Sequence, residues 1–304
     1  MMAGREAAVQ DLVIHPVRLD WVSLKTRHGR LLRRVRREWA IYLTLAVCAV
    51  ILNIPFYYMC ITAFRSNAEM AGIDLGLWLS DPTIEPIMSL LEGSAYLRAA
   101  ANSAAIALIS TMANVLLCPL AGYAFAKLHF PGRDRIFMLL LGTMMIPGAV
   151  LIVPGFLLAR DLGWINTYAP LLVPGLGSVF YVFLSRQFII KIPDALIMAA
   201  RLDGCSELRI FFQIILPLIR PLLASIGILT FLGSWNSFLT PMVYLFDESS
   251  YTLPLVISML QGRFRGQENI QMAGALLSIV PVLIVFFVLQ KQIIDSFANS
   301  GLKE

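Results

Sequence analysis

The sequence predicts an all-α membrane protein that crosses the bilayer six times. The chain is 58% hydrophobic and only 14% charged, with a mean hydropathy of +0.76, whereas soluble domains carry about 25% charged residues. Several apolar runs reach the roughly 20 residues that a helix needs to cross the hydrocarbon core. Short alternating strands of the kind that build a closed barrel are absent from the sequence, so the spanning segments are predicted to be helices.

Six apolar segments are expected to form the membrane spans. They are 39–64, 99–126, 136–159, 168–190, 217–246 and 270–290. An even number of spans places both chain ends on the same side of the membrane. The predicted organisation is a basic tail over 1–38, a first helix over 39–64, an extracytoplasmic loop over 65–97 and a five-helix core over 98–304 that contains a loop at 191–217.

The distribution of Lys and Arg predicts the orientation. The chain has 24 of these residues, and most of them precede the first span or fall between later spans on the same side. The exceptions are Arg65, Arg98, Arg160, Arg263 and Arg265. Because basic residues accumulate on the cytoplasmic side of a membrane protein, both termini are expected to be cytoplasmic, in a bacterial inner membrane. The net charge of +5 then reflects topology. No nucleic-acid partner is expected, since the basic run has no aromatic interleaving and no binding motif.

Motifs for catalysis, nucleotide binding and metal binding are missing from the sequence. It contains no phosphate-binding loop, no His-Glu-x-x-His and no Gly-x-Ser-x-Gly. Its four cysteines form no Cys-x-x-Cys pair, and His15, His28 and His129 have no second ligand at metal-binding spacing. We therefore expect a non-catalytic subunit with no metal site and no cofactor of its own.

The loop at 191–217 is predicted to form two short helices. Pro193 and Asp194 suit a helix N-terminus, so a helix is expected from about Asp194 to Leu202. Gly204 can adopt the left-handed conformation that ends it. A second helix is expected to begin after Ser206, which can cap it, and to bend at Pro217 into the next span. Its apolar residues recur at helical spacing; they are Leu208, Phe211, Phe212 and Ile215.

The spacing of residues in this loop resembles the EAA loop of ABC importer permeases. That pattern is Glu-Ala-Ala, three residues, Gly, nine residues, Ile, one residue and Leu-Pro, and it is matched throughout except that Met198 replaces Glu. The resemblance implies a type I ABC importer permease fold and an ATPase-coupling role for this loop. The implied coupling residues are Met198, Ala199, Ala200, Asp203, Gly204, Phe211, Ile214, Leu216 and Pro217.

Two small alanines on the exposed side of the first short helix would let it enter a groove on a partner. The alternative is a cytoplasmic hairpin without a partner, in which Ala199 and Ala200 serve only as good helix formers.

Further motifs are similar to carbohydrate-type permeases related to the maltose system. They are Gly-Ser-Trp-Asn-Ser-Phe at 233–238, Tyr-Thr-Leu-Pro-Leu at 251–255, Met-Ala-Gly at 272–274 and Ala-Gly-Tyr-Ala-Phe-Ala-Lys at 121–127. The resemblance implies a complex with a second permease, two ATPase subunits that bind ATP and Mg, and an extracytoplasmic solute-binding protein. It implies a carbohydrate solute, although glycerol phosphates and acidic oligosaccharides stay open because similar family members transport them.

Polar and aromatic side chains within the spans are the candidates for contact with a hydroxylated solute. The candidates for the solute path are Asn102, Asn114, Tyr181, Trp235, Asn236 and Ser237, with Thr111, Thr143, Ser185 and Ser234 also available. Trp235 and Asn236 are favoured, because an indole stacks on sugar CH groups and an amide both donates and accepts hydrogen bonds. The alternative is that these residues join helices to one another.

Two other functional classes make different demands on the sequence. A secondary transporter driven by an ion gradient should carry an intramembrane acid or base, and the six predicted spans hold almost no central ionisable residue. A membrane-embedded enzyme would need a catalytic pair at depth, and the sequence shows none. The importer hypothesis is therefore preferred to both.

Overall fold

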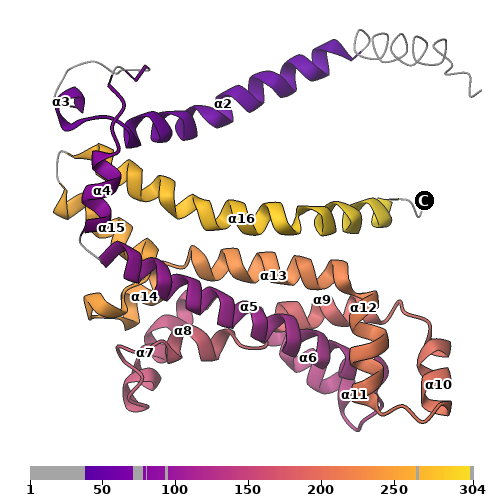
Figure 1. Cartoon of the computed structure of the whole chain (residues 1–304). Coiled ribbons are helices and arrows are strands. Elements are labelled where there is room, and N and C mark those ends of the chain that lie inside the picture. Colours follow the sequence, from indigo (N-terminus) through magenta and orange to yellow (C-terminus); the bar gives the residue numbers. More distant parts are fainter. Residues whose placement is uncertain (1–37, 71–77, 80, 93–94, 265–266, 302–304) are drawn as a thin grey trace, which may run out of the picture. The chain divides into compact units, whose positions relative to one another are not determined.

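A computed structural model describes residues 38–70, 78–79, 81–92, 95–264 and 267–301. The predicted basic tail lies outside the described residues except for Glu38. The chain divides into two units, 1–57 and 58–304, and the first ends within helix α2 (Trp39–Ala63). The later helices, labelled in Figure 1, are α3 (Asn67–Met70), α4 (Glu85–Glu92), α5 (Ala95–Lys127), α6 (Arg133–Thr143), α7 (Ile152–Asp161), α8 (Ala169–Leu172), α9 (Val179–Ile189), α10 (Asp194–Leu202), α11 (Glu207–Ile210), α12 (Leu216–Leu218), α13 (Arg220–Trp235), α14 (Leu239–Tyr244), α15 (Leu253–Arg263) and α16 (Glu268–Gly301).

The predicted all-α class is confirmed for the part of the chain that the structure describes. Its β contact is an isolated bridge between Arg65 and Pro82. Within the described ranges, four segments are long and apolar enough to span a membrane: Trp39–Ala63, Ala95–Lys127, Ala169–Ile189 and Glu268–Val288. Two bent helix pairs raise the number of candidate spans to six, in agreement with the six apolar segments of the sequence.

The predicted third span, 136–159, is broken. Helix α6 and the segment Gly148–Asp161 meet at 86°, and the break falls between Thr143 and Gly148. Pro147 explains its position, because proline disfavours a helical conformation at the preceding residue and supplies no amide hydrogen to continue the ladder. The segment 136–159 therefore counts as one span made of two helices.

The predicted fifth span, 217–246, is also interrupted. The segment Glu207–Leu218 meets α13 at 82°, so the bend lies at Ile219, two residues beyond the predicted Pro217. Pro221 stands in the first turn of α13, where its missing amide hydrogen costs no helical bond, and a new helix therefore starts there. At its far end α13 stops at Trp235, and α14 is a separate short helix.

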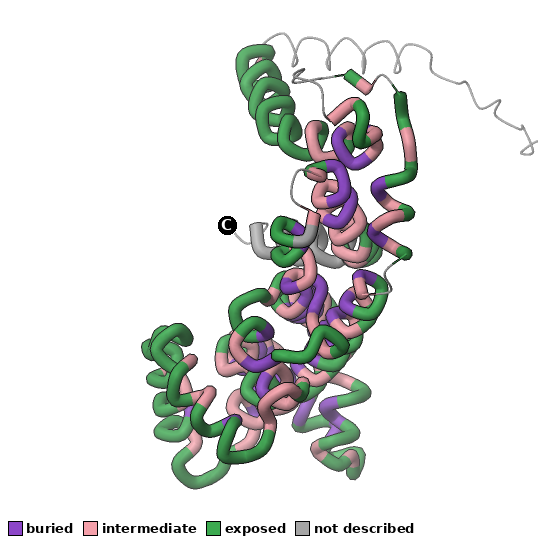
Figure 2. Tube along the Cα trace, turned by 90° about the vertical axis from the view of Figure 1, so that its left-hand side faces the viewer, coloured by how far each residue is buried: buried purple, intermediate pink, exposed green. Residues whose placement is uncertain are grey.

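Helix α5 is the central element of the second unit. It packs against α9, α13 and α15 and contributes to both hydrophobic clusters of the core. One cluster lies where the 191–217 loop packs, around Tyr123, Ile210 and Phe211. The other includes Tyr96 and Trp235. Figure 2 shows buried positions alternating with exposed ones along the packed helices, as helices with one face toward a core require.

The contact between α5 and α9 depends on a glycine. A Cβ atom added at Gly122 would lie 2.5 Å from the Cβ of Ser185 and 2.9 Å from the backbone nitrogen of Arg186. Small residues at such crossings let helix backbones approach closely. Gly122 therefore fixes how near the two helices stand.

Candidate functional site

The first arm of the 191–217 loop is helix α10, which begins and ends at the predicted residues, Asp194 and Leu202. Gly204 has φ +77°, and its N–H donates to the carbonyl of Arg201 at 3.0 Å. The N–H of Cys205 donates to the carbonyl of Ala200 at 3.0 Å. These two bonds form a Schellman motif, so the predicted role of Gly204 in ending the helix is confirmed.

The second arm begins as predicted and then departs from the prediction. The Ser206 hydroxyl accepts a hydrogen bond from the N–H of Arg209 and caps α11. The next turn, Phe211–Ile215, is π-helical, a form that inserts one residue into a helix and rotates the next turn about the helix axis. Phe211 is buried, but Leu208 and Phe212 are exposed. The apolar face predicted from α-helical spacing is therefore divided between the core and the surface.

The loop exposes several apolar side chains. Met198 is 58% exposed and Leu202 is 89% exposed. Ala199 is also exposed, but Ala200 is only 6% exposed and packs in the core. The expectation that both alanines face outward was wrong, because α10 rests on the core through Ile197 and Ala200. Of the other coupling candidates, the exposed ones are Asp203, Gly204 and Pro217, and the partly buried ones are Ile214 and Leu216.

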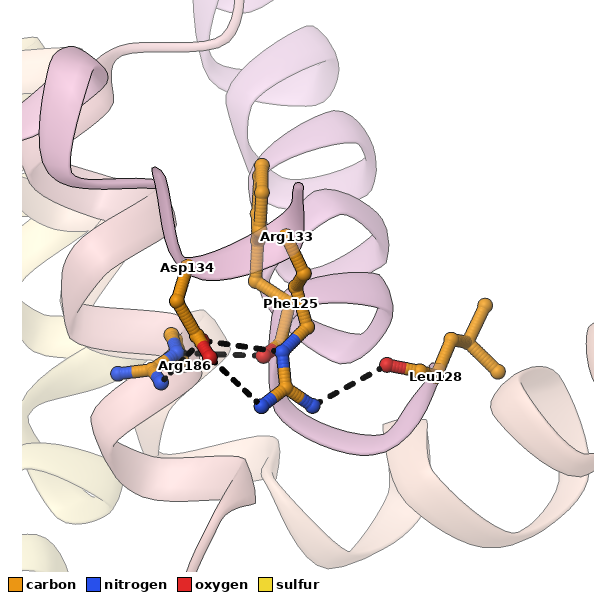
Figure 3. A network of polar contacts seen from close by, with 5 residues as sticks. All are labelled: Phe125, Leu128, Arg133, Asp134 and Arg186. Carbon is orange, nitrogen blue, oxygen red and sulfur yellow. Dashed lines mark hydrogen bonds and ion pairs between the residues drawn. The ribbon is translucent and has the colours of Figure 1, made fainter. Parts of the chain in front are cut away.

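A second set of contacts fixes the helix ends beside this loop (Figure 3). Arg186 on α9 donates from Nε to the carbonyl of Phe125 at 3.2 Å. Its guanidinium lies 4.4 Å from the ring centroid of Phe137 and 3.8 Å from Asp134. Asp134 also accepts from Arg133 at 3.1 Å. One arginine thus joins α5, α6 and α9 through a carbonyl, an aromatic ring and a carboxylate.

A cavity of about 260 Å³ lies among α5, α8, α9, α13 and α14. Its polar lining consists of Ser103, Ser110, Asn114, Tyr181, Thr230, Ser234, Ser237, Thr240 and Thr252. Among the residues that the structure describes, no Asp, Glu, Lys or Arg lines it. The hydroxyls of Thr230 and Thr252 are buried and find no hydrogen-bond partner among the described residues.

Three of the six predicted solute-path residues line this cavity: Asn114, Tyr181 and Ser237. The Asn114 amide is hydrogen-bonded to the backbone of α5 and of the segment before α9. Its Nδ2 donates to the carbonyls of Ser110 at 2.9 Å and Gly175 at 3.0 Å, and its Oδ1 accepts from the N–H of Ser178 at 3.1 Å. Asn114 therefore holds the interrupted segment before α9 against α5.

The other three predicted residues lie elsewhere. Asn102 donates to the carbonyls of Ser249 and Tyr251, at 3.0 Å each. Trp235 is 3% exposed, is stacked on the ring of Phe231, and donates to the carbonyl of Ser278 at 3.2 Å. Asn236 donates to the carbonyl of Leu232 on its own helix. Trp235 and Asn236 line a second cavity, of about 340 Å³, together with Phe238, Ser258 and Gln261, so their contact with solute stays a prediction.

Sequence reasoning missed several cavity-lining hydroxyls, Thr230, Thr240 and Thr252 among them. One signal was available, because Ser103, Ser110 and Asn114 stand at helical spacing along α5 and share its cavity face. Thr240 and Thr252 come from segments outside long helices, where periodicity gives no such signal.

Comparison with known proteins identifies the family. Residues 119–298 match the family described as binding-protein-dependent transport system inner membrane component. The chain is 34% identical to the arabinooligosaccharides transport system permease protein AraQ of Halalkalibacterium halodurans, over 88% of this chain and 96% of the relative. It is 34% identical to the lactose transport system permease protein LacG of Rhizobium radiobacter, over 66% and 73%.

The fold has a close counterpart among solved structures. A chain of a bacterial ABC transporter involved in the import of the acidic polysaccharide alginate superposes with a TM-score of 0.75 and 25% identity, covering 85% of this chain and 97% of that one. The family predicted from the 198–217 motif is thus confirmed. The chain belongs to the family of binding-protein-dependent transport system inner membrane components, the permease subunits of ABC importers.

Proposed function

We propose that this permease forms half of the translocation path of an ATP-driven importer for neutral sugars or oligosaccharides. A second permease supplies the other half, and two ATPase subunits bind ATP and Mg and hydrolyse the nucleotide, so this chain is not catalytic. A solute-binding protein delivers the solute from the extracytoplasmic side. Both termini are cytoplasmic in a bacterial inner membrane.

The uncharged cavity carries the proposal for the solute class. A carboxylate or phosphate that entered it would lose hydration without meeting a cation, which is costly in a low-dielectric site. Hydroxyl and amide groups instead match the hydroxyls of a neutral sugar. The relatives named for arabinooligosaccharide and lactose transport support the same class. The counterpart named for alginate import makes acidic oligosaccharides the alternative to test.

The exposed apolar face of α10 supports the ATPase-coupling proposal. Contiguous exposed apolar side chains mark interaction surfaces, and Met198 and Leu202, four residues apart on one face of α10, are both exposed. Met198 replaces a carboxylate that at an exposed site contributes about 0–1 kcal/mol. Docking through apolar contact is therefore expected without the family's Glu.

The first test is ATP hydrolysis by the complex that co-purifies with this chain, reconstituted in lipid with its binding protein. The solutes are neutral oligosaccharides, acidic oligosaccharides and glycerol phosphate. We expect stimulation by a neutral sugar. Stimulation only by an acidic solute would overturn the solute class, and the absence of any co-purifying ATPase would overturn the coupling role of the 191–217 loop.

Removing the unpartnered hydroxyls of the cavity is expected to weaken solute handling. Thr230→Val and Thr252→Val preserve side-chain shape, and each should raise the solute concentration for half-maximal transport by roughly two- to tenfold, the effect of losing one hydrogen bond. Thr62→Val is the matched control, since Thr62 is fully buried with an unpartnered hydroxyl but does not line the cavity. Unchanged transport in both cavity variants would show that solute does not contact this wall.

A further inference from the structure

Helix α5 ends in a buried lysine that holds the 191–217 loop at its start. Lys127 is 8% exposed. Its ammonium donates to the carbonyl of Ile192 at 2.6 Å, to Asp194 Oδ1 at 2.6 Å and to the carbonyl of Ile190 at 3.4 Å. All three N–H groups are thus used. The hydrogen bond from Lys127 is the main reason why the pKa of the Asp194 carboxyl is lower than its ordinary value. The carboxylate is therefore charged at neutral pH and the contact persists.

One turn earlier, α5 holds the second arm of the loop. Tyr123 is 2% exposed, and its hydroxyl donates to Glu207 Oε2 at 2.6 Å. The other carboxylate oxygen of Glu207 accepts from Arg201 Nε at 2.7 Å, which joins α11 to α10. Residues four apart lie on one face of a helix. One face of α5 therefore binds both arms of the loop through hydrogen bonds.

The same helix reaches the cavity. Ser103, Ile106, Ser110 and Asn114 of α5 line the cavity, and α5 is one helix from Ala95 to Lys127, with Pro119 in its interior. The predicted third and fifth spans, in contrast, are bent by more than 80°. Pro119 removes one hydrogen bond of α5, but the helix continues on both sides of it, whereas a span that is broken can absorb a displacement at its break. Helix α5 is therefore the direct mechanical connection between the loop and the cavity.

We propose that Tyr123 and Lys127 are positioning residues that transmit movement of the 191–217 loop along α5 to the cavity. The proposal rests on the proposed function, in which an ATPase docks on this loop. Neither residue is among those that line the cavity. Each acts by tying one arm of the loop to α5, so that the loop cannot move without the helix.

The Lys127 contact resists separation because its charge is buried. An exposed ion pair contributes little, and Asp194 is exposed. The ammonium, however, would be left with unpaired N–H groups in a buried site if the loop moved alone, and breaking such a contact is costly. Movement of α5 with the loop preserves every one of these bonds.

The test uses a double variant that carries both Tyr123→Phe and Lys127→Met, and it uses Tyr96→Phe as the control. Tyr96 is a matched control, because it is buried on the same helix and its hydroxyl donates one bond, to the carbonyl of Gly274 at 2.7 Å, at the opposite end of α5. Hydrogen exchange of residues 103–114 and 191–217 is measured in the purified complex, with and without a non-hydrolysable ATP analogue, and transport is measured as solute moved per ATP hydrolysed.

We expect the analogue to change exchange in both segments of the wild type and of Tyr96→Phe. In the double variant the change should persist at 191–217 and vanish at 103–114, and solute per ATP should fall at least fivefold. Retention of the change at 103–114 in the double variant, or its absence in the wild type, would overturn the proposal. If the double variant does not assemble, Tyr123→Phe alone should halve the change.

The exchange measurement needs no solute, so its result separates the two proposals. A complex that shows analogue-dependent change at 103–114 but responds to no neutral sugar would refute the solute class and leave the role of Tyr123 and Lys127 intact. A complex that is stimulated by a neutral sugar but shows no analogue-dependent change at 103–114 would refute only the role of Tyr123 and Lys127.

Discussion

Replacing Gly122 by leucine is expected to prevent the helical core from folding. Its Cβ would stand 2.5 Å from the Cβ of Ser185 and 2.9 Å from the nitrogen of Arg186, distances that no side-chain rotation can relieve because the second atom is backbone. Overpacking costs about 1–3 kcal/mol where neighbours can shift. Here α9 itself must move, and with it the contacts of Arg186 with α5 and α6, so we expect a larger loss.

The effect is measured as the yield of monodisperse protein from membranes and as its thermal unfolding in detergent. Gly142→Leu is the matched control, since a Cβ at Gly142 meets nothing within 4 Å and the same change raises helix propensity. We expect Gly142→Leu to be tolerated and Gly122→Leu to leave little folded protein. Equal yields and equal unfolding temperatures would show that α5 and α9 do not pack as closely as described.

Gly204→Pro is expected to abolish the coupling of ATP hydrolysis to transport while the protein still inserts and folds. Gly204 has φ +77° and donates its N–H to the carbonyl of Arg201. Proline is fixed near φ −65° and has no N–H, so the Schellman turn cannot form. A cost of about 3 kcal/mol corresponds to a roughly 100-fold fall in the fraction of loops with the docking conformation.

Gly163 provides the control for this change. It has φ +69°, its N–H donates to the carbonyl of Arg160 at 3.0 Å, and the N–H of Trp164 donates to the carbonyl of Ala159 at 2.8 Å. The same turn therefore occurs far from the 191–217 loop. Gly163→Pro should lower stability and keep solute-stimulated ATP hydrolysis. Solute-stimulated hydrolysis at the wild-type rate in Gly204→Pro would contradict the coupling role.

Much of the fold is determined by rules that act over a few residues. The apolar runs predict where the chain crosses the membrane because a helix of sufficient length satisfies all its backbone polar groups within the hydrocarbon. The bounds of α10, the left-handed Gly204 and the Ser206 cap were predictable because capping depends on the residues at the helix ends. The spacing of the loop motif predicted the family.

The features that the sequence did not predict depend on contacts between distant segments. The orientation of Ala200 toward the core is decided by how α10 packs on it, and the π-helical turn at Phe211–Ile215 rotates the residues on its two sides relative to one another. A sequence does not show what an indole packs against, so the place of Trp235 against Phe231 and Ser278 could not be foreseen. The cavity collects residues from five helices and adjoining segments.

Because the cavity residues of α5 and Lys127 lie on the same helix, insertions and deletions within that helix should be poorly tolerated. Each helical residue adds about 1.5 Å and turns the chain by about 100°. One inserted codon between those for Asn114 and Tyr123 would leave the cavity wall in place and swing Tyr123 and Lys127 away from Glu207 and Asp194. Insertions and deletions should therefore be tolerated outside α5 more often than within it, and the number of residues from Ser103 to Lys127 should be nearly invariant among functional versions of this permease.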